Sequence, residues 1–326
     1  MEREPIHSAI FIVNSRSSRF ESDRADALES VLEDFCSVSR VNLCENPGKN
    51  ALDITRAFEF AQRVSKPTGV IFYSGDGTVK QGLEILSQNT NLRETAVFVS
   101  IKAGEYNINQ GVYGIQPDPE VLSHTLRQGQ VLFVDKLDAD MKGNETKDQA
   151  LISFGFIYGN LVYAYEQARG VNNFPLPKFI RRMTKLALGG RGFGPYRPDR
   201  VTIEGENGLI YEGLAAMVET LNGPHLARIK IKRGTIYDGR LTIAYIPVPT
   251  GGKVEAILRL GAGFALANFG LDRANPFLRQ VPGTHVSIQF SSPQTYHADG
   301  EAGKGRVQGA HVQVIPATVP FLVRAD

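Results

Sequence analysis

The chain has 326 residues, of which 42% are hydrophobic and 21% charged, and its formal net charge is +2. A chain of this length typically forms about two domains and buries enough apolar surface to fold without disulfides. The near-neutral charge argues against a nucleic-acid-binding protein. Cys36 and Cys44 lack metal or redox spacing, and no apolar run approaches a membrane-spanning length. We therefore expect a soluble, cytoplasmic protein without a nucleic-acid partner.

The first third of the chain alternates between strand-like and helix-like patterns. Short apolar runs predict strands at 9–13, 38–43, 69–73 and 95–101. Between these runs apolar residues recur at helical spacing, and Pro67 ends the second helical segment. This order predicts an α/β domain over residues 1–133, with a mostly parallel sheet covered by helices.

The pattern changes near residue 130. Short segments rich in β-branched residues follow, at 131–134, 201–204, 227–231, 241–246, 286–290 and 312–315. Turn-forming residues separate several of them, at 206–208, 238–239 and 299–300. We expect a second, antiparallel and sandwich-like β domain over residues 134–310. Only the segments 151–167 and 178–188 are predicted to be helical in it.

A glycine-rich turn, Ser74–Thr78 (SGDGT), lies between the predicted strand at 69–73 and a predicted helix. Glycines let a backbone approach a ligand closely, and a helix N-terminus offers N–H groups and partial positive charge to a phosphate. Asp76 would repel a bare phosphate, so the site would need Mg²⁺ or a hydroxyl between them. The alternative is a tight turn in which Asp76 caps the following helix.

A pair of carboxylates occurs late in the chain, at Asp299 and Glu301. In an extended segment, residues two apart share a face, so both side chains could point into one site. Phosphorylation of an alcohol needs a group that accepts the hydroxyl proton and acidic groups that hold Mg²⁺. The alternative is an Asp-Gly turn followed by a solvated glutamate.

Several of these segments resemble one family. SGDGT is similar to the GGDGT signature of diacylglycerol, sphingosine and ceramide kinases, which NAD kinases share. Residues 14–18 (NSRSS) resemble the N-P-x-S-G stretch of the lipid kinases, and residues 102–107 (KAGEYN) resemble their P-x-G-T-x-N-D. Residues 222–223 (NG) and 233–241 resemble the N-G turn and the A-x-x-D-D-G-x-L-D stretch that follows it. Asp-Gly-Glu at 299–301 is similar to their late D-G-E signature, so the chain is identified with the lipid-kinase-like superfamily.

The resemblance implies an ATP- and Mg²⁺-dependent lipid kinase acting on a lipid such as diacylglycerol or a sphingoid base. It implies that residues 311–326 pack back on the first domain and that the active site lies in the cleft between the domains. Asp299 would be the general base and Glu301 would assist it, while Asp76 and Glu301 would hold Mg²⁺. The implied nucleotide-binding residues are Asn14, Ser17, Ser74, Gly75, Asp76, Gly77, Thr78, Gly104 and Asn107.

Residues 102–108 depart from the family pattern. Lys102 replaces a proline, Glu105 replaces a neutral threonine beside the phosphates, and Ile108 replaces an aspartate. These changes leave open a catalytically impaired lipid-kinase-like protein that binds lipid or nucleotide. A kinase of a soluble substrate, similar to NAD kinase, is a further alternative.

A local basic segment could bring the protein to a membrane. Residues 168–200 carry eight Lys or Arg residues and one Asp, so this stretch is +7 and the remainder is −5. The residues predicted to contact an anionic lipid surface are Lys178, Arg181, Arg182 and Lys185. The alternative is a domain-packing helix with a solvated basic face. We expect a cytoplasmic protein that visits the membrane transiently and could form a homodimer through edge strands.

Overall fold

A computed structural model describes residues 6–17, 19–64, 68–88, 96–103, 114–157, 197–223, 225–226, 229–230, 235–249, 252–268, 275–299 and 301–324. The chain divides into two compact units. Unit 1 comprises Met1–Val134 and Ala317–Asp326, and unit 2 comprises Asp135–Pro316. The sequence-based division had the first domain end at 133 and the chain return to it at 311. The structure has the chain return to unit 1 six residues later.

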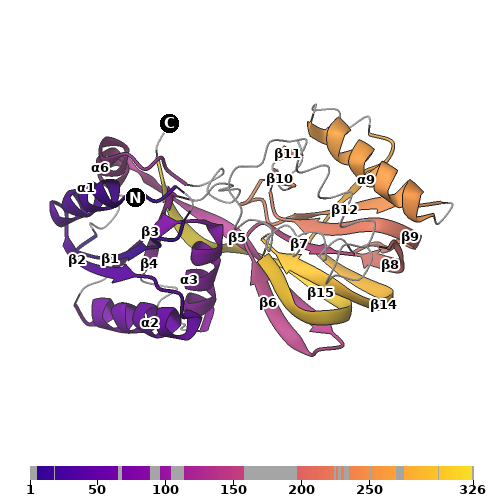
Figure 1. The fold of residues 1–326 in the computed structure, drawn as a ribbon, viewed down its shortest axis with the longest axis horizontal. Helices are drawn as coiled ribbons and strands as arrows, with labels where there is room; N and C mark the ends of the chain where they lie inside the picture. Colours follow the sequence, from indigo (N-terminus) through magenta and orange to yellow (C-terminus); the bar gives the residue numbers. More distant parts are fainter. Residues whose placement is uncertain are drawn as a thin grey trace. The chain divides into compact units, whose positions relative to one another are not determined.

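In the part of unit 1 that the structure describes, a parallel sheet lies between two pairs of helices (Figure 1). Its strands are β1 (Ser8–Val13), β2 (Ser37–Asn42), β3 (Thr68–Ser74) and β4 (Ala96–Lys102). They lie in the order β2-β1-β3-β4, and each of these pairs is parallel. The helices are α1 (Ser22–Glu33), α2 (Pro47–Val64), α3 (Asp76–Gln88) and α6 (Pro119–Gln128). α1 lies beside α6 on one face, and α2 lies beside α3 on the other.

The helices explain why the central strands are continuous apolar runs. Every residue of β1 and of β3 is buried, because helices cover both faces of the sheet. Side chains of β1, β3, β4, α1 and α6 share one hydrophobic cluster, which includes Phe11, Leu28 and Leu122. The C-terminal strand adds Leu322 to this cluster.

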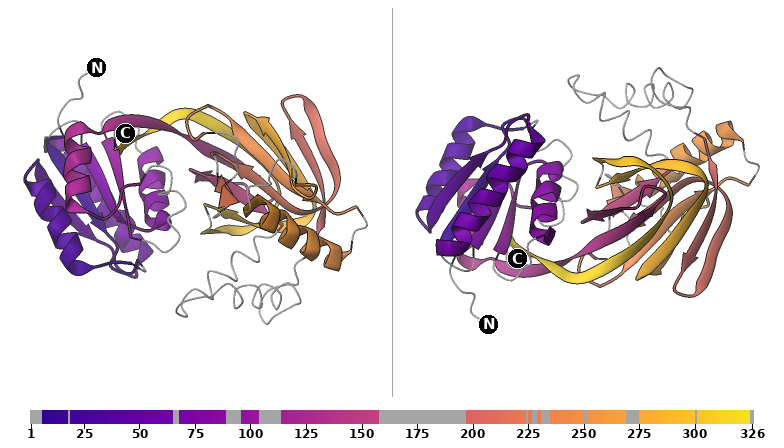
Figure 2. Two further views of the ribbon diagram at one scale, coloured as in Figure 1. Left: turned by 90° about the horizontal axis from the view of Figure 1, so that it is seen from above. Right: turned by 90° about the horizontal axis from the view of Figure 1, so that it is seen from below.

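Unit 2 is rich in antiparallel strands. Two long strands that pair with one another carry the chain into and out of it: β5 (Gln130–Lys142) and β15 (Glu301–Val323) (Figure 2). The other strands are β6 (Thr146–Ala150), β7 (Ser153–Phe156), β8 (Asp199–Gly205), β9 (Gly208–Leu221), β10 (His225–Leu226), β11 (Ile229–Lys230), β12 (Leu241–Pro247), β13 (Arg279–Gly283) and β14 (His285–Ala298). One described helix, α9 (Lys253–Asn268), follows β12.

Two short strands share one position in this sheet. β7 and β8 both pair with β9 on one side and with β14 on the other. β8 pairs with the first part of β14, at 286–290, and β7 pairs with its end, at 296–298. The pairing places β7 beside the end of β14, close to the turn that contains Asp299.

The prediction of a helix at 151–167 is wrong for the described part of that segment. Residues 153–156 form β7, and residues 158–167 lie outside the described part of the chain. All four residues of β7 are buried, so the apolar run fits a strand enclosed on both faces as well as it fits a helix. The segment forms a strand because it is hydrogen-bonded to β9 and β14, which are distant in sequence.

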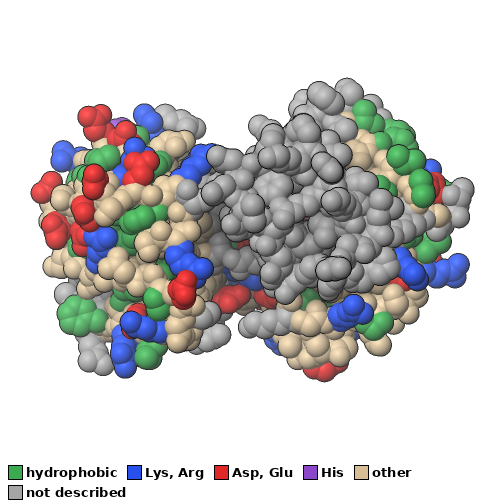
Figure 3. Space-filling model, viewed as in Figure 1, with side chains coloured by type: hydrophobic (Ala, Val, Ile, Leu, Met, Phe, Trp, Pro, Cys, Tyr) green, Lys and Arg blue, Asp and Glu red, His purple; other side chains and the backbone are tan. Residues whose placement is uncertain are grey.

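Helix α9 was not predicted from the sequence. An amphipathic surface helix is recognised by an apolar stripe opposite a polar face. α9 lacks this contrast, because Val254 and Leu258 are 69% and 67% exposed while Ala256 and Leu260 on the same helix are buried. Figure 3 shows hydrophobic side chains gathered along the exposed side of this helix. The predicted helix at 178–188 lies outside the described residues.

The hydrogen bonds between strands differ from the two-sheet sandwich expected for the second domain. The described strands of unit 2, apart from the β10–β11 pair, belong to one hydrogen-bonded sheet rather than to two separate sheets. That sheet continues through β15, whose Phe321 pairs in parallel with Phe98 of β4. Among the described helices, none is both long enough and apolar enough to cross a membrane.

Candidate functional site

Three strands of unit 1 end at one edge of its parallel sheet. Asn14, Gly75 and Ala103 directly follow β1, β3 and β4, and these strands run in the same direction. The backbone N–H of Asn14 donates to the carbonyl of Tyr73 at 3.2 Å, and that of Ala103 donates to the carbonyl of Ser74 at 3.0 Å. In α/β sheets, the carboxyl ends of the strands are where ligands usually bind.

Side-chain hydrogen bonds join the turns that follow β1 and β3. The Asn14 amide (Nδ2) donates to the Thr78 hydroxyl (Oγ1) at 3.0 Å. The Ser17 hydroxyl (Oγ) accepts from the backbone N–H of Gly75 at 3.1 Å. Two segments about sixty residues apart are thereby brought together. The residues united here are Asn14, Ser17, Ser74, Gly75 and Thr78, which are five of the predicted nucleotide-binding residues.

Helix α3 begins at this junction. Asp76 and Gly77 form its first turn, so the partial positive charge of the helix N-terminus lies beside the joined turns. The first N–H groups of an α-helix have no partner within the helix and suit an anionic ligand. Thr78, also in the first turn, accepts a hydrogen bond from Asn14, and its own hydroxyl hydrogen can still be donated. The side chain of Asp76 lies outside what the structure describes.

The same contacts also give Asn14 and Ser17 a role in local structure. The Asn14 carbonyl oxygen (Oδ1) accepts from the backbone N–H of Arg16 at 3.1 Å, which is an Asx-type turn. The backbone N–H of Ser17 donates to the carbonyl of Asn14 at 3.0 Å. The turn after β1 is thus held in place by its own side chains and by α3. Such preorganisation suits a binding site and a structural turn alike.

Some predicted residues fall outside the described part of the chain. Gly104 and Asn107 are among them, as are the departures Glu105 and Ile108. The predicted membrane-contact residues also lie outside it: Lys178, Arg181, Arg182 and Lys185. Lys102 is described as half-buried at the end of β4, where its backbone N–H donates to the carbonyl of Ile115 at 3.1 Å.

Asp299 lies in a hairpin turn rather than in an extended segment. Ala298 and Glu301 pair with each other across the end of β14 and the start of β15. Asp299 has a φ of +53°, in the left-handed region that aspartate adopts more readily than most residues. Of the two interpretations of residues 297–301, the structure therefore shows the turn, because an Asp-Gly pair favours a two-residue hairpin connection. Glu301 is the first residue of β15, and its side chain lies outside what the structure describes.

The Asp299 carboxylate is held by three consecutive backbone N–H groups. Its Oδ2 accepts from Leu151 at 2.8 Å, and its Oδ1 accepts from Ile152 at 2.8 Å and from Ser153 at 2.9 Å. The backbone N–H of Asp299 returns a hydrogen bond to the carbonyl of Ser153 at 2.8 Å. We call residues 151–153 the amide cradle of Asp299. The cradle fixes the orientation of the carboxylate, which is only half-buried.

A buried asparagine supports the amide cradle from β9. Asn222 follows β9, and its side-chain amide donates to the carbonyls of Asp135 and Leu151, both at 2.8 Å. Its backbone N–H donates to the carbonyl of Ile152. Asn222 is fully buried, so its two donated bonds compensate for the loss of water around the amide nitrogen, whereas its Oδ1 has no hydrogen-bond partner among the described residues. The Asn-Gly at 222–223 was noticed only through the family resemblance, and the contacts assign it this supporting position.

The Asp-Gly pair at 238–239 is a local turn. The Asp238 carboxylate accepts from the backbone N–H groups of Thr235 and Arg240, both at 3.0 Å. Gly239 has a φ of +68°, and its N–H donates to the Asp135 carboxylate at 2.7 Å.

Across the described residues, no group of three or more His, Cys, Asp or Glu side chains is arranged to hold a metal ion.

Comparisons with known proteins show the fold. No protein-family model and no curated protein matches the sequence. Solved structures do match, and three of them come from Bacillus anthracis str. Sterne; one is named as a diacylglycerol kinase and two are named provisionally as such. Their TM-scores to this chain are 0.67, 0.68 and 0.68, at 15%, 17% and 18% identity. The alignments cover 98% of this chain and 98–99% of theirs. The chain thus shares its fold with diacylglycerol kinase-like structures over 98% of its length.

Proposed function

We propose that this protein is an ATP- and Mg²⁺-dependent lipid kinase that phosphorylates a hydroxyl of a lipid such as diacylglycerol or a sphingoid base. The observation that carries the proposal is the junction of Asn14, Ser17 and Thr78 at the start of α3. This junction lies at the carboxyl edge of a parallel sheet, within a fold shared with diacylglycerol kinase-like proteins.

In this proposal unit 1 binds the nucleotide. The N–H groups of the first turn of α3 and the hydroxyl of Thr78 donate to phosphate oxygens, with Asn14 and Ser17 holding the turn. Gly104 and Asn107 belong to the same proposed site. Asp76 and Glu301 fit Mg²⁺ in chemistry, because carboxylate oxygens are the ligands that this hard cation prefers. The ion would neutralise charge on the phosphates.

Asp299 accepts the proton in the proposed reaction. The lipid hydroxyl oxygen forms a bond to the γ-phosphorus of ATP, the bond from that phosphorus to the β-phosphate bridging oxygen breaks, and ADP leaves. The hydroxyl proton passes to the Asp299 carboxylate, which the amide cradle holds in one orientation. Glu301 assists this step or the metal.

The test is transfer of labelled γ-phosphate to a total lipid extract presented in mixed micelles with Mg²⁺. We expect labelled lipid with wild-type protein, and a fall in kcat of about 100-fold or more for Asp299→Asn with little change in the KM for ATP. Asp199→Asn is the matched control, because Asp199 also accepts three hydrogen bonds in unit 2. Failure to label any lipid, or an Asp299→Asn variant as active as wild type, would refute the proposal.

The departures at Glu105 and Ile108 favour a second candidate, a lipid-kinase-like protein that binds lipid or nucleotide without catalysis. Titration calorimetry separates the two. Lipid binding without Mg-ATP binding, together with absent transfer, would favour the second candidate. A phosphorylated soluble product, identified by its mass, would point instead to a kinase similar to NAD kinase.

We further propose that the basic segment containing Lys178, Arg181, Arg182 and Lys185 contacts an anionic membrane. The protein would then be cytoplasmic and visit the membrane transiently to reach its substrate. Sedimentation with anionic and with neutral vesicles tests this, and equal binding to both would contradict it. A homodimer remains a prediction that analytical ultracentrifugation can check.

A further inference from the structure

Unit 2 contains a buried acid–base pair that the proposed phosphoryl transfer does not use. The imidazole Nε2 of His297, on β14, lies 3.4 Å from the carboxylate Oε2 of Glu219, on β9. His297 is 4% exposed and Glu219 is 1% exposed. Long acidic side chains are almost never fully buried unless they are paired, so this contact calls for an explanation.

Strand β7 lies between the two strands that carry the pair, so His297 and Glu219 contact each other across β7. His297 pairs with Gly155 of β7, and Gly155 in turn pairs with Glu219. Residues directly opposite one another in neighbouring strands project to the same face of the sheet. Gly155 has no side chain, and a Cβ built there would overlap both His297 Nε2 and Glu219 Oε2. The contact between β14 and β9 therefore depends on a glycine in β7.

Stability alone is a weak reason for such a pair. Burial of ionisable groups costs desolvation energy, and well-packed apolar side chains often stabilise a core as well or better. Removing one member is costly, however, because it leaves the other buried without its partner. A buried pair of this kind ties its elements to one arrangement, and here the elements are β9, β7 and β14.

The tied strands lead directly to the cradled carboxylate. His297 lies near the end of β14, two residues before Asp299 in the following turn. Gly155 is two residues after Ser153, whose N–H and carbonyl both bond to Asp299. A relative shift of β7 and β14 would therefore move the amide cradle and the carboxylate relative to each other.

We propose that Glu219 and His297 are positioning residues for Asp299: the pair holds β7 and β14 in register, so that the amide cradle orients the carboxylate. This inference rests on the proposed function for its catalytic consequence. Its structural part, the dependence of the cradle on the pair, can be measured without any enzymatic activity.

Two measurements on the same variants test the inference. In His297→Ala we expect kcat for lipid phosphorylation to fall at least about tenfold while the KM for ATP stays within about twofold. Amide hydrogen exchange at Ile152 and Ser153 should accelerate at least about tenfold, because their acceptor is no longer held in place. His297→Gln keeps an N–H that can reach Glu219, and it should restore most of both properties.

Tyr296→Phe is the matched control. Tyr296 is the neighbouring residue of β14, is buried, and donates its hydroxyl to the Asp148 carboxylate at 3.0 Å. Neighbouring residues of a strand project to opposite faces, so this variant removes a partly buried hydrogen bond without touching the pair. We expect kcat and the exchange rates at Ile152 and Ser153 to remain as in wild type.

Each outcome decides the inference. If His297→Ala does not fold, Glu219→Ala replaces it, since a buried imidazole that loses this contact is tolerated better than a buried carboxylate that loses it. Unchanged exchange at Ile152 and Ser153 in a folded variant would overturn the positioning role, even if kcat falls. If wild-type protein phosphorylates no lipid, the proposed function fails, and the exchange rates still show whether the pair holds the cradle.

Discussion

Asp299 lies in a turn, and its carboxylate is held by the backbone of a distant segment. An Asp-Gly pair between two strands indicates a hairpin turn, and Asp299 does occupy that turn at a positive φ. Its carboxylate nevertheless turns to residues 151–153 rather than to solvent alone. The turn interpretation is confirmed, and a catalytic role for the cradled carboxylate stays a prediction.

Cys36 provides a pH-dependent prediction at the level of a single residue. Burial raises the pKa of its thiol from an ordinary value near 9 to about 11. The folded protein therefore keeps a proton that the unfolded chain releases between these values, and stability present below pH 9 is lost as the pH rises to about 11. We expect the free energy of unfolding to fall more steeply over this range in wild type than in Cys36→Ala.

The measurement is urea unfolding followed by circular dichroism at several pH values from 8 to 11. Parallel curves for the two proteins would contradict the prediction. Cys44→Ala serves as the control, and we expect its curve to follow that of wild type. Alkylation at pH 8 adds a second readout, since a protonated thiol at Cys36 should react slowly.

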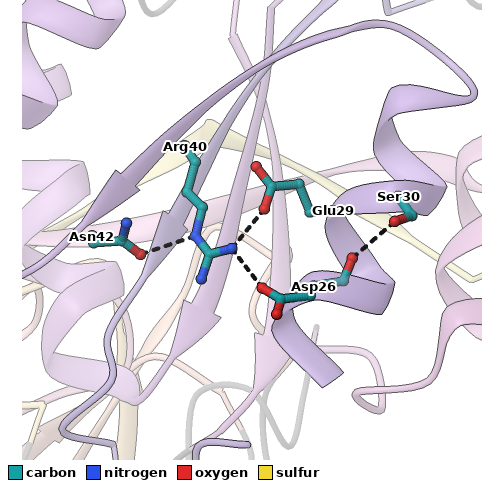
Figure 4. Close-up of polar contacts among 5 residues, drawn as sticks. All are labelled: Asp26, Glu29, Ser30, Arg40 and Asn42. Atoms are coloured by element: carbon teal, nitrogen blue, oxygen red, sulfur yellow. Dashed lines mark hydrogen bonds and ion pairs between the residues drawn. The ribbon is translucent and has the colours of Figure 1, made fainter. Parts of the chain in front are cut away.

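At the scale of elements, an ion-pair cluster ties the edge strand β2 to α1 (Figure 4). The Arg40 guanidinium donates from Nη1 to Asp26 at 2.8 Å and to Glu29 at 2.6 Å, and from Nε to the side-chain oxygen (Oδ1) of Asn42 at 2.9 Å. The hydrogen bond to Asp26 raises the pKa of Arg40 most, with a further contribution from Glu29. The cluster fastens the outermost strand of the sheet to the helix beside it.

We expect Arg40→Ala to lower the free energy of unfolding by about 1 kcal/mol, because the cluster is partly exposed and screened by solvent. The loss should shrink in 1 M NaCl, where charges are screened within about 3 Å. Arg24→Ala, which removes an exposed pair with Glu21, should cost less than about 0.5 kcal/mol. Denaturant titration of both variants at low and high salt checks this, and a salt-independent loss for Arg40→Ala would argue against an ionic contribution.

At the scale of the whole molecule, unit 1 is completed by the end of the chain. Phe321 and Leu322 are fully buried in it, and the Phe321 ring lies 5.7 Å from the Phe98 ring of β4. The last strand therefore covers part of the core that residues 1–134 build. Residues far apart in the chain must both be present for this core to close.

We expect Phe321→Ala to lower the free energy of unfolding by about 3–5 kcal/mol, the cost of emptying a buried aromatic site. Leu209→Ala is the control, because Leu209 is 60% exposed and its loss should change stability by less than about 0.5 kcal/mol. Chemical unfolding of the two variants measures both losses. Similar losses for the two variants would show that Phe321 adds little to the core.

Local patterns alone were enough to locate β1, β3, β4 and the glycine turn at 74–78. Buried parallel strands are continuous apolar runs and glycines punctuate them, so the necessary information lies within a few neighbouring residues. The family resemblance pointed to the same turn and to Asp299. The Asn14–Thr78 contact then followed a simple rule, that parallel strands end at one edge of a sheet.

Long-range pairing decided the rest. A short apolar run is compatible with a helix or with an enclosed strand. Residues 153–156 form a strand, β7, because they pair with β9 and β14. The amide cradle lies about 148 residues before the carboxylate it holds, and the Glu219–His297 contact requires a glycine on a third strand. No local pattern records such contacts, because their energies depend on which distant backbone groups the fold brings within hydrogen-bonding distance.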